Sequence, residues 1–153
     1  MTEGVVAIPV TKNGRILAVC DGENTGKKEK LGWDLVGDRK SIAGKMQFIG
    51  GVSESDDLIS ELIREGSEET KVEFSRTDFV ETGVGTLIEH QRANGEVLLV
   101  GVSIYWLLLS NEMERELRDG GAVDMTEMLE LRERDMIIYG LIKDKVPDSL
   151  TIS

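Results

Sequence analysis

The stretch that decides the fold runs from Gly50 to Val72 and reads GGVSESDDLISELIREGSEETKV. It opens with two glycines and leads into a Glu-rich segment of helical character. Glu65, Glu68 and Glu69 follow the spacing i, i+3, i+4, which places three carboxylates on one face of a helix. Like charges held this close repel each other, and a bound cation relieves the repulsion. Because Mg²⁺ and Mn²⁺ prefer oxygen ligands, the stretch predicts metal-assisted chemistry on a phosphate ester or anhydride.

This stretch resembles the Nudix box, the signature of hydrolases that act on a nucleoside diphosphate linked to another group. The family pattern is Gly, five residues, Glu, seven residues, Arg-Glu, an aliphatic residue, any residue, Glu-Glu, any residue, Gly and an aliphatic residue. The matching positions here are Gly50, Arg64, Glu65, Glu68, Glu69 and Val72. The chain departs from the pattern at Asp56, Gly66 and Lys71, where the family has Glu, an aliphatic residue and Gly. Gly51 also lies one residue closer to the helix than usual, so we expect a glycine loop that is one residue short.

The resemblance implies an α/β (α+β) fold, namely a Nudix-like α/β/α sandwich with a mixed β-sheet, in a single domain over residues 1–153. It also implies a hydrolase that uses a divalent metal ion, Mg²⁺ or Mn²⁺, to activate the water that cleaves a pyrophosphate bond. The implied substrate is a nucleoside triphosphate or a similar small nucleotide.

The resemblance further assigns roles within the box. Glu65 and Glu69 are expected to bind the metal directly, and Glu68 to bind it or to act through water. A backbone carbonyl in the glycine turn, at Gly50, would complete the metal site. Arg64 is expected to hold the carboxylates in place by a salt bridge. Glu68, Glu65 and Arg64 are therefore the predicted catalytic residues.

The general base is open at this point. Glu68 within the box is one possibility, and a carboxylate outside the box is another. The outside candidates are Glu112, Glu114, Glu116, Asp119, Asp124, Glu127 and Glu89. The only histidine, His90, lies near a hairpin end and is expected to be exposed and inert. Trp33 and Lys45 are candidate substrate contacts; Trp33 either stacks on a nucleobase or packs against the protein.

The helical wheel gives an argument independent of the resemblance. One apolar stripe is formed by Leu58, Ile59, Leu62 and Ile63, with Gly66 at its centre. Glycine inside a helix costs about 1 kcal/mol relative to alanine, which is easier to understand if another backbone approaches closely there. Glu61 shares the neighbouring face with the box carboxylates, and Asp56 is expected to complement the helix dipole. The alternative is a solvated acidic face with an ordinary Arg64–Glu68 pair.

Composition sets outer limits. The chain has 153 residues, of which 40% are hydrophobic and 31% charged, as in one soluble globular domain. A net charge of −11 argues against binding to nucleic acid or an anionic membrane, but not against a nucleotide, since a bound cation inverts the local field. The single cysteine, Cys20, excludes an intramolecular disulfide and is expected to be buried. With no visible signal peptide or membrane span, a cytoplasmic location is expected. The expected partner is a small nucleotide, and a homodimer is left open.

Turn and periodicity signals outline the remaining elements. Two Asn-Gly turns predict hairpins, one joining runs 5–10 and 15–20 and one joining 79–89 and 96–109. Further strands are expected at 33–36, 45–49, 72–74 and 127–131. Helices are expected at 56–70, 111–118 and 133–143. A long loop at 21–44 and a loose tail at 148–153 complete the outline.

Two other functions stay open. The departures from the box and the short glycine loop suggest a Nudix-fold module that binds nucleotides or regulates, with little catalysis. The intact Glu65, Glu68 and Glu69 argue against it, because a binding-only module has no reason to keep three mutually repelling acids. The other alternative is an interaction domain whose acidic helix binds a basic partner, with steep salt dependence and no need for a divalent ion.

Overall fold

The computed structural model of the chain describes residues 2–20, 46–53, 56–91, 94–126, 131 and 133–146. The expected loop at 21–44, the strand at 33–36 and the tail at 148–153 lie outside these residues, as do Trp33, Lys45 and Glu127. The side chains of Cys20 and His90 also lie outside the described part. No helix in the described ranges is long and apolar enough to cross a membrane.

Two sheets form the frame of the molecule. The larger has the strand order β4-β1-β6-β5, built from Ile49–Val52, Thr2–Val10, Val97–Leu108 and Phe79–Gln91. The smaller has the order β3-β2-β7, built from Met46–Gln47, Leu17–Cys20 and Val123–Asp124. The β1 and β6 strands run parallel, whereas β1–β4 and β5–β6 are antiparallel, so the larger sheet is mixed.

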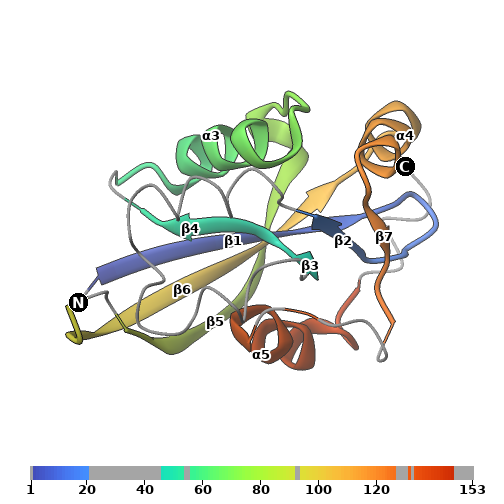
Figure 1. Cartoon of the computed structure of the whole chain (residues 1–153). Coiled ribbons are helices and arrows are strands. Elements are labelled where there is room, and N and C mark those ends of the chain that lie inside the picture. The colour runs from blue at the N-terminus through green and yellow to red at the C-terminus, as the bar shows by residue number, and fades with distance from the viewer. Residues whose placement is uncertain are drawn as a thin grey trace.

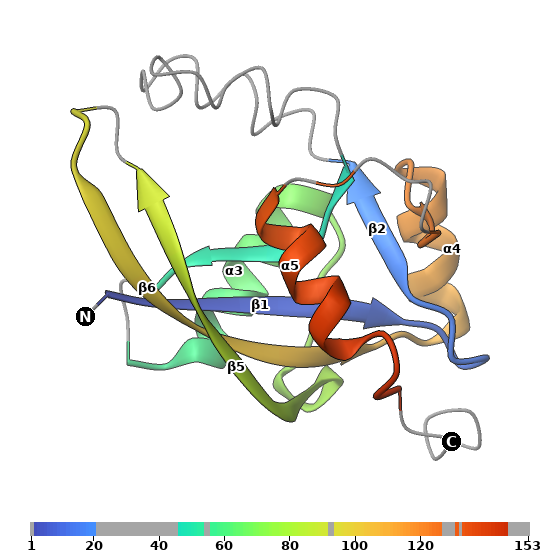
Figure 2. The ribbon, with the colours of Figure 1, turned by 90° about the horizontal axis from the view of Figure 1, so that it is seen from below.

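Helices cover both faces of the larger sheet. Helices α3 (Leu58–Thr70) and α4 (Asn111–Asp119) lie on one face, and α5 (Glu133–Ile142) lies on the other (Figure 1; Figure 2 gives the view from the α5 side). The strand β1 is apolar throughout its centre because both faces are covered: Val5 and Ala7 pack on the α3 side, and Val6 and Ile8 on the α5 side. This is the expected α/β/α sandwich, and the helices predicted at 111–118 and 133–143 are confirmed.

The first Asn-Gly turn forms, but its hairpin does not extend. Gly14 adopts φ 80° and its N–H donates to the Thr11 carbonyl at 2.9 Å. Beyond this turn only Val10 and Ile16 pair, and β2 then departs into the smaller sheet. Further along β1, β4 pairs with Gly4–Ala7, and β2 pairs instead with β3 and β7.

The second hairpin is confirmed over most of its length. The strands β5 and β6 pair from Phe79–Leu107 to Gln91–Val97, with an irregularity between Glu81 and Gly85. There the Thr82 hydroxyl donates to the Ile104 carbonyl at 2.7 Å, which replaces a missing ladder bond.

The glycine pair was expected in a turn, and this expectation is wrong. Gly50 and Gly51 lie inside β4 and pair with Val6 and Val5 of β1. Gly50 has φ +147°, and a Cβ there would collide with the Val5 carbonyl oxygen, so only glycine permits this close strand pairing. The helix α3 begins at Leu58 rather than near Asp56.

The segment after α3 also differs from expectation. No strand forms at 72–74; instead Lys71 ends the helix in the left-handed conformation, with φ 65°, and the side chains of Val72 and Phe74 turn back into the core. A Cβ on Gly66 would lie 2.9 Å from the Phe74 ring. The close approach at Gly66 is therefore that of an aromatic side chain and not of a backbone. A short 3₁₀ helix, η1 (Arg76–Asp78), then leads into β5.

We expect Gly66→Ala to destabilise the fold by about 1–3 kcal/mol, because the added methyl group overpacks against Phe74. Urea unfolding followed by circular dichroism measures the change. Gly140→Ala is the matched control: nothing lies within 4 Å of a Cβ at Gly140 in α5. That variant should gain about 0.5–1 kcal/mol from helix propensity. Equal stabilisation of both variants would contradict the packing of Phe74 on Gly66.

Candidate functional site

The start of α3 is fixed by Asp57. Its Oδ1 accepts from the Ser60 backbone N–H at 3.2 Å, and its Oδ2 accepts from the Ser60 hydroxyl at 2.8 Å. Arg76 forms an ion pair with the same carboxylate at 2.8 Å. The helix-capping acid is therefore Asp57, and the neighbouring Asp56, which was expected to complement the dipole, is exposed one position earlier.

Arg64 lies at the centre of the acidic face of α3. Its Nη2 donates to Glu61 Oε2 at 2.7 Å and to Glu65 Oε1 at 2.9 Å. Its Nη1 donates to both oxygens of Glu68, at 3.2 and 3.3 Å. The hydrogen bond to Glu61, together with the negative charges of Glu65 and Glu68, raises the pKa of Arg64. The predicted salt-bridging role of Arg64 agrees with these contacts.

Glu61 is the most enclosed member of this group. Only 7% of the residue is exposed, and its partner is the Arg64 guanidinium. A buried carboxylate that lost its partner would be strongly destabilising, so Glu61 anchors Arg64 from the core side of the helix. The sequence placed Glu61 on this face but did not single it out, because the i, i+3, i+4 pattern of the box starts four residues later.

The glycine strand lies directly beside the acidic face. A Cβ on Gly51 would be 3.3 Å from Glu65 Oε1, so this glycine leaves room next to a predicted metal ligand. Arg134 of α5 approaches the same strand from the other side and donates to the Phe48 carbonyl at 3.0 Å and to the Gly50 carbonyl at 3.4 Å. A carbonyl oxygen has two lone pairs, so the Gly50 contact with Arg134 leaves one for another ligand.

The acidic face carries the type of ligand atom that a divalent cation prefers, but the arrangement of these side chains fits a cation less well. Glu65, Glu68 and Glu69 supply hard oxygen ligands, and Gly51 supplies space beside one of them. In the described ranges, however, no three acidic, histidine or cysteine side chains are grouped so that they could hold a metal ion. Among the described residues, Arg64 places a positive charge in contact with Glu61, Glu65 and Glu68.

The carboxylates proposed as an outside base fall into two groups. Glu114 and Asp124 both bind Arg118, at 2.9 and 2.8 Å, and Asp124 also faces Arg15 at 3.5 Å. These contacts tie α4 to β7. The other described candidates are exposed residues, namely Glu89, Glu112, Glu116 and Asp119. The choice of base stays a prediction, and so do the roles of Trp33, Lys45 and Glu127, which are outside the described residues.

Comparison with known proteins identifies the fold. No family model and no curated protein matches the chain. Among solved structures, NrtR from Shewanella oneidensis is similar with a TM-score of 0.57 and 13% identity, over 94% of this chain and 63% of that one. A MutT/nudix family protein from Enterococcus faecalis is similar with a TM-score of 0.44 and 12% identity, over 69% of this chain and 36% of that one. The chain thus spans less than two thirds of the length of either structure. At identities this low, the structural similarity shows a Nudix-like fold alone. The chemistry has to be argued from the side chains of the site.

The capping of α3 makes one pH-dependent prediction. Hydrogen bonds and the ion pair with Arg76 lower the pKa of Asp57 from 3.8 to about 2. Because the folded-state pKa is depressed, the stabilisation is complete above the unfolded-state pKa and is lost as the pH falls through the folded-state pKa. We therefore expect Asp57→Ala to lower the urea midpoint at neutral pH, with a difference from the unmodified protein that narrows from pH 3.8 down to about 2.

Asp56→Ala is the matched control for this prediction, since Asp56 is exposed and adjacent to the cap. It should leave the urea midpoint almost unchanged at every pH. A larger effect from Asp56→Ala than from Asp57→Ala would overturn the assignment of the cap.

Proposed function

We propose that the protein is a divalent-metal-dependent hydrolase that cleaves a pyrophosphate bond in a nucleoside triphosphate or a similar small nucleotide. The observation that carries the proposal is the acidic face of α3, where Glu65 and Glu68 gather at Arg64 beside the opening left by Gly51. The Nudix-like fold supports it, because a fold of this kind is shared with a protein described as belonging to the MutT/nudix family.

Glu65 and Glu69 would hold the ion, with Glu68 and the Gly50 carbonyl as further ligands. A bound Mg²⁺ or Mn²⁺ neutralises charge on the diphosphate and lowers the pKa of water. Arg64 would keep the carboxylates in position, anchored by Glu61 at 2.7 Å. Glu68 or a carboxylate outside the box would accept the proton of the attacking water. Water adds to one phosphorus as the bridging P–O bond breaks, which gives a nucleoside monophosphate and a second phosphorylated product.

A second candidate is a Nudix-fold module that binds a nucleotide or regulates, with little catalysis. The contacts of Arg64 with three glutamates favour it, because an internal cation satisfies these acids without metal. The departures at Asp56, Gly66 and Lys71 favour it as well.

A hydrolysis screen separates the two candidates. The panel contains nucleoside triphosphates, oxidised ones included, ADP-ribose, dinucleoside polyphosphates and nucleotide sugars, each with Mg²⁺ or Mn²⁺. We expect turnover of at least one compound and a loss of about 100-fold or more in kcat with Glu69→Gln, as is usual when a charge-stabilising group is removed. EDTA should abolish turnover.

Glu73→Gln is the control, since Glu73 is an exposed acid just beyond α3. It should leave kcat unchanged. Direct titration with Mn²⁺ completes the test. Metal binding without turnover of any compound would favour the binding module, and turnover that persists in both EDTA and Glu69→Gln would overturn the metal-dependent proposal.

A further inference from the structure

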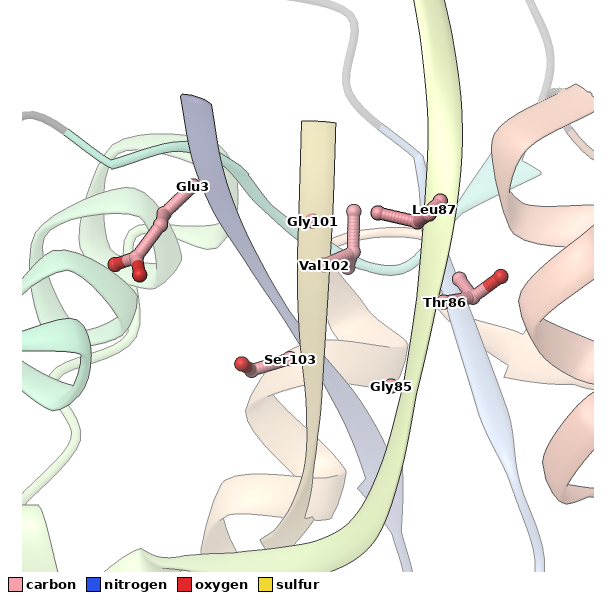
Figure 3. Close-up of a pocket in the computed structure, with 7 residues that line it drawn as sticks. All are labelled: Glu3, Gly85, Thr86, Leu87, Gly101, Val102 and Ser103. Atoms are coloured by element: carbon pink, nitrogen blue, oxygen red, sulfur yellow. The ribbon is translucent and has the colours of Figure 1, made fainter. Parts of the chain in front are cut away.

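A hollow of about 380 Å³ opens on the α3 face of the larger sheet, away from the helix-covered core. Its lining residues are Glu3, Gly85, Thr86, Leu87, Gly101, Val102 and Ser103. Figure 3 shows Glu3, Ser103 and Leu87 pointing toward the same side, whereas Thr86 points to the opposite side of β5.

The register of the sheet connects this hollow to the acidic face. Val5 of β1 pairs with Gly51 on one side and with Ser103 on the other, and Ser103 pairs with Gly85. Paired residues point to the same face, so these residues form one row, in which the buried Val5 lies between the opening beside Glu65 and the hollow. Neighbouring strands are about 4.8 Å apart, which puts Ser103 about 10 Å from Gly51. A nucleotide with its phosphates at Glu65 reaches across such a distance.

The floor of the hollow is built from small residues. Gly85, Gly101 and Ser103 replace the large apolar side chains found further along the same face of the sheet, where Tyr105 and Leu107 pack under α3. The next row pairs Glu3 with Gly101 and Gly101 with Leu87. The floor is therefore flat. Glu3 lies on one side of it and Leu87, which is 57% exposed, lies on the other.

We infer that this hollow binds the nucleobase of the substrate, and that Glu3 selects bases that carry an amino group. The inference rests on the proposed function for the class of substrate. A carboxylate accepts hydrogen bonds and donates none, so it pairs with an amino edge and opposes a carbonyl edge. Its charge also repels phosphate, whereas the divalent cation of the proposed function would attract the phosphates of the substrate to the α3 end. Ser103 adds a hydroxyl that donates or accepts, and Leu87 offers apolar surface to a ring.

Cytidine and uridine form the matched pair of probes, because cytosine presents an exocyclic amino donor beside an acceptor ring nitrogen, where uracil presents a carbonyl oxygen beside a ring N–H. In amide NMR spectra of the whole chain, we expect cytidine to shift the signals of Gly85, Gly101 and Ser103. Uridine should bind about tenfold more weakly, the difference expected for one hydrogen bond to a charged group. Equal shifts with both nucleosides, shifts confined to other residues, or no shift with cytidine would each overturn the inference.

Glu3→Gln tests the role of the carboxylate. Gln offers both a donor and an acceptor, so the preference for cytidine over uridine should fall from about tenfold to near unity. Glu96→Gln is the control, an exposed acid just before β6 that does not line the hollow, and it should retain the preference. A Glu3→Gln variant that keeps the full preference would overturn the inference.

These measurements do not depend on hydrolysis, so a failure of this inference can be distinguished from a failure of the proposed function. Turnover in the substrate screen together with unshifted hollow signals would leave a hydrolase whose base binds elsewhere. Selective cytidine shifts without turnover would keep the hollow as a base site and favour the binding module.

Discussion

The arrangement of this molecule depends on the double pairing of β1. Both edges of that strand are occupied, by β4 in antiparallel register and by β6 in parallel register. The pairing brings the glycine strand, the acidic helix that follows it and the hollow over β6 onto one face of one sheet. The strand β2 lies in the second, smaller sheet, where it pairs with β3 and β7.

Electrostatics on α3 is the second organising feature. Four glutamates lie within nine residues of one helix, and such a density of like charge is unfavourable unless a cation compensates it. Arg64 supplies the compensation, with Glu61 as its buried partner and Glu65 and Glu68 as its more exposed partners. The two interpretations of the site therefore differ in one respect: whether or not a metal ion binds to these carboxylates together with Arg64.

The sequence predicted elements well where the signal was local. The helices α3, α4 and α5 form close to where they were expected, and Asn-Gly turns located two reversals of the chain. It failed where tertiary contacts decide. Nothing local shows that Gly50 and Gly51 continue a strand, because their need for glycine comes from the approach of β1. Phe74 was taken for a strand residue because its hydrophobicity serves equally well in a loop folded over Gly66.

Prediction of the site was limited for a similar reason. The roles of the box residues and of Arg64 were expected from the resemblance, whereas spacing alone placed Glu65, Glu68 and Glu69 on one face of the helix. In the structure Glu65 and Glu68 both contact Arg64. Glu61 acquires its role from burial. Asp57 acquires its role from Arg76, which lies 19 positions along the chain from it. Arg134 could not be connected with Gly50 at all, since the two are 84 positions apart. The row that joins Gly51 to Ser103 depends on strand order, which no short pattern encodes.

The pairing of β1 with β6 has a consequence for biogenesis. These partners are separated by almost 100 positions, from Thr2–Val100 to Val10–Leu108. During synthesis the first strand therefore leaves the ribosome long before its parallel partner exists. Contacts so distant in sequence slow folding, because the intervening chain must be closed into a loop before the contact forms. Until then one edge of the apolar strand β1 is unpaired and can pair with other chains. The nascent protein is therefore more prone to aggregation than the folded protein, in which β6 covers this edge.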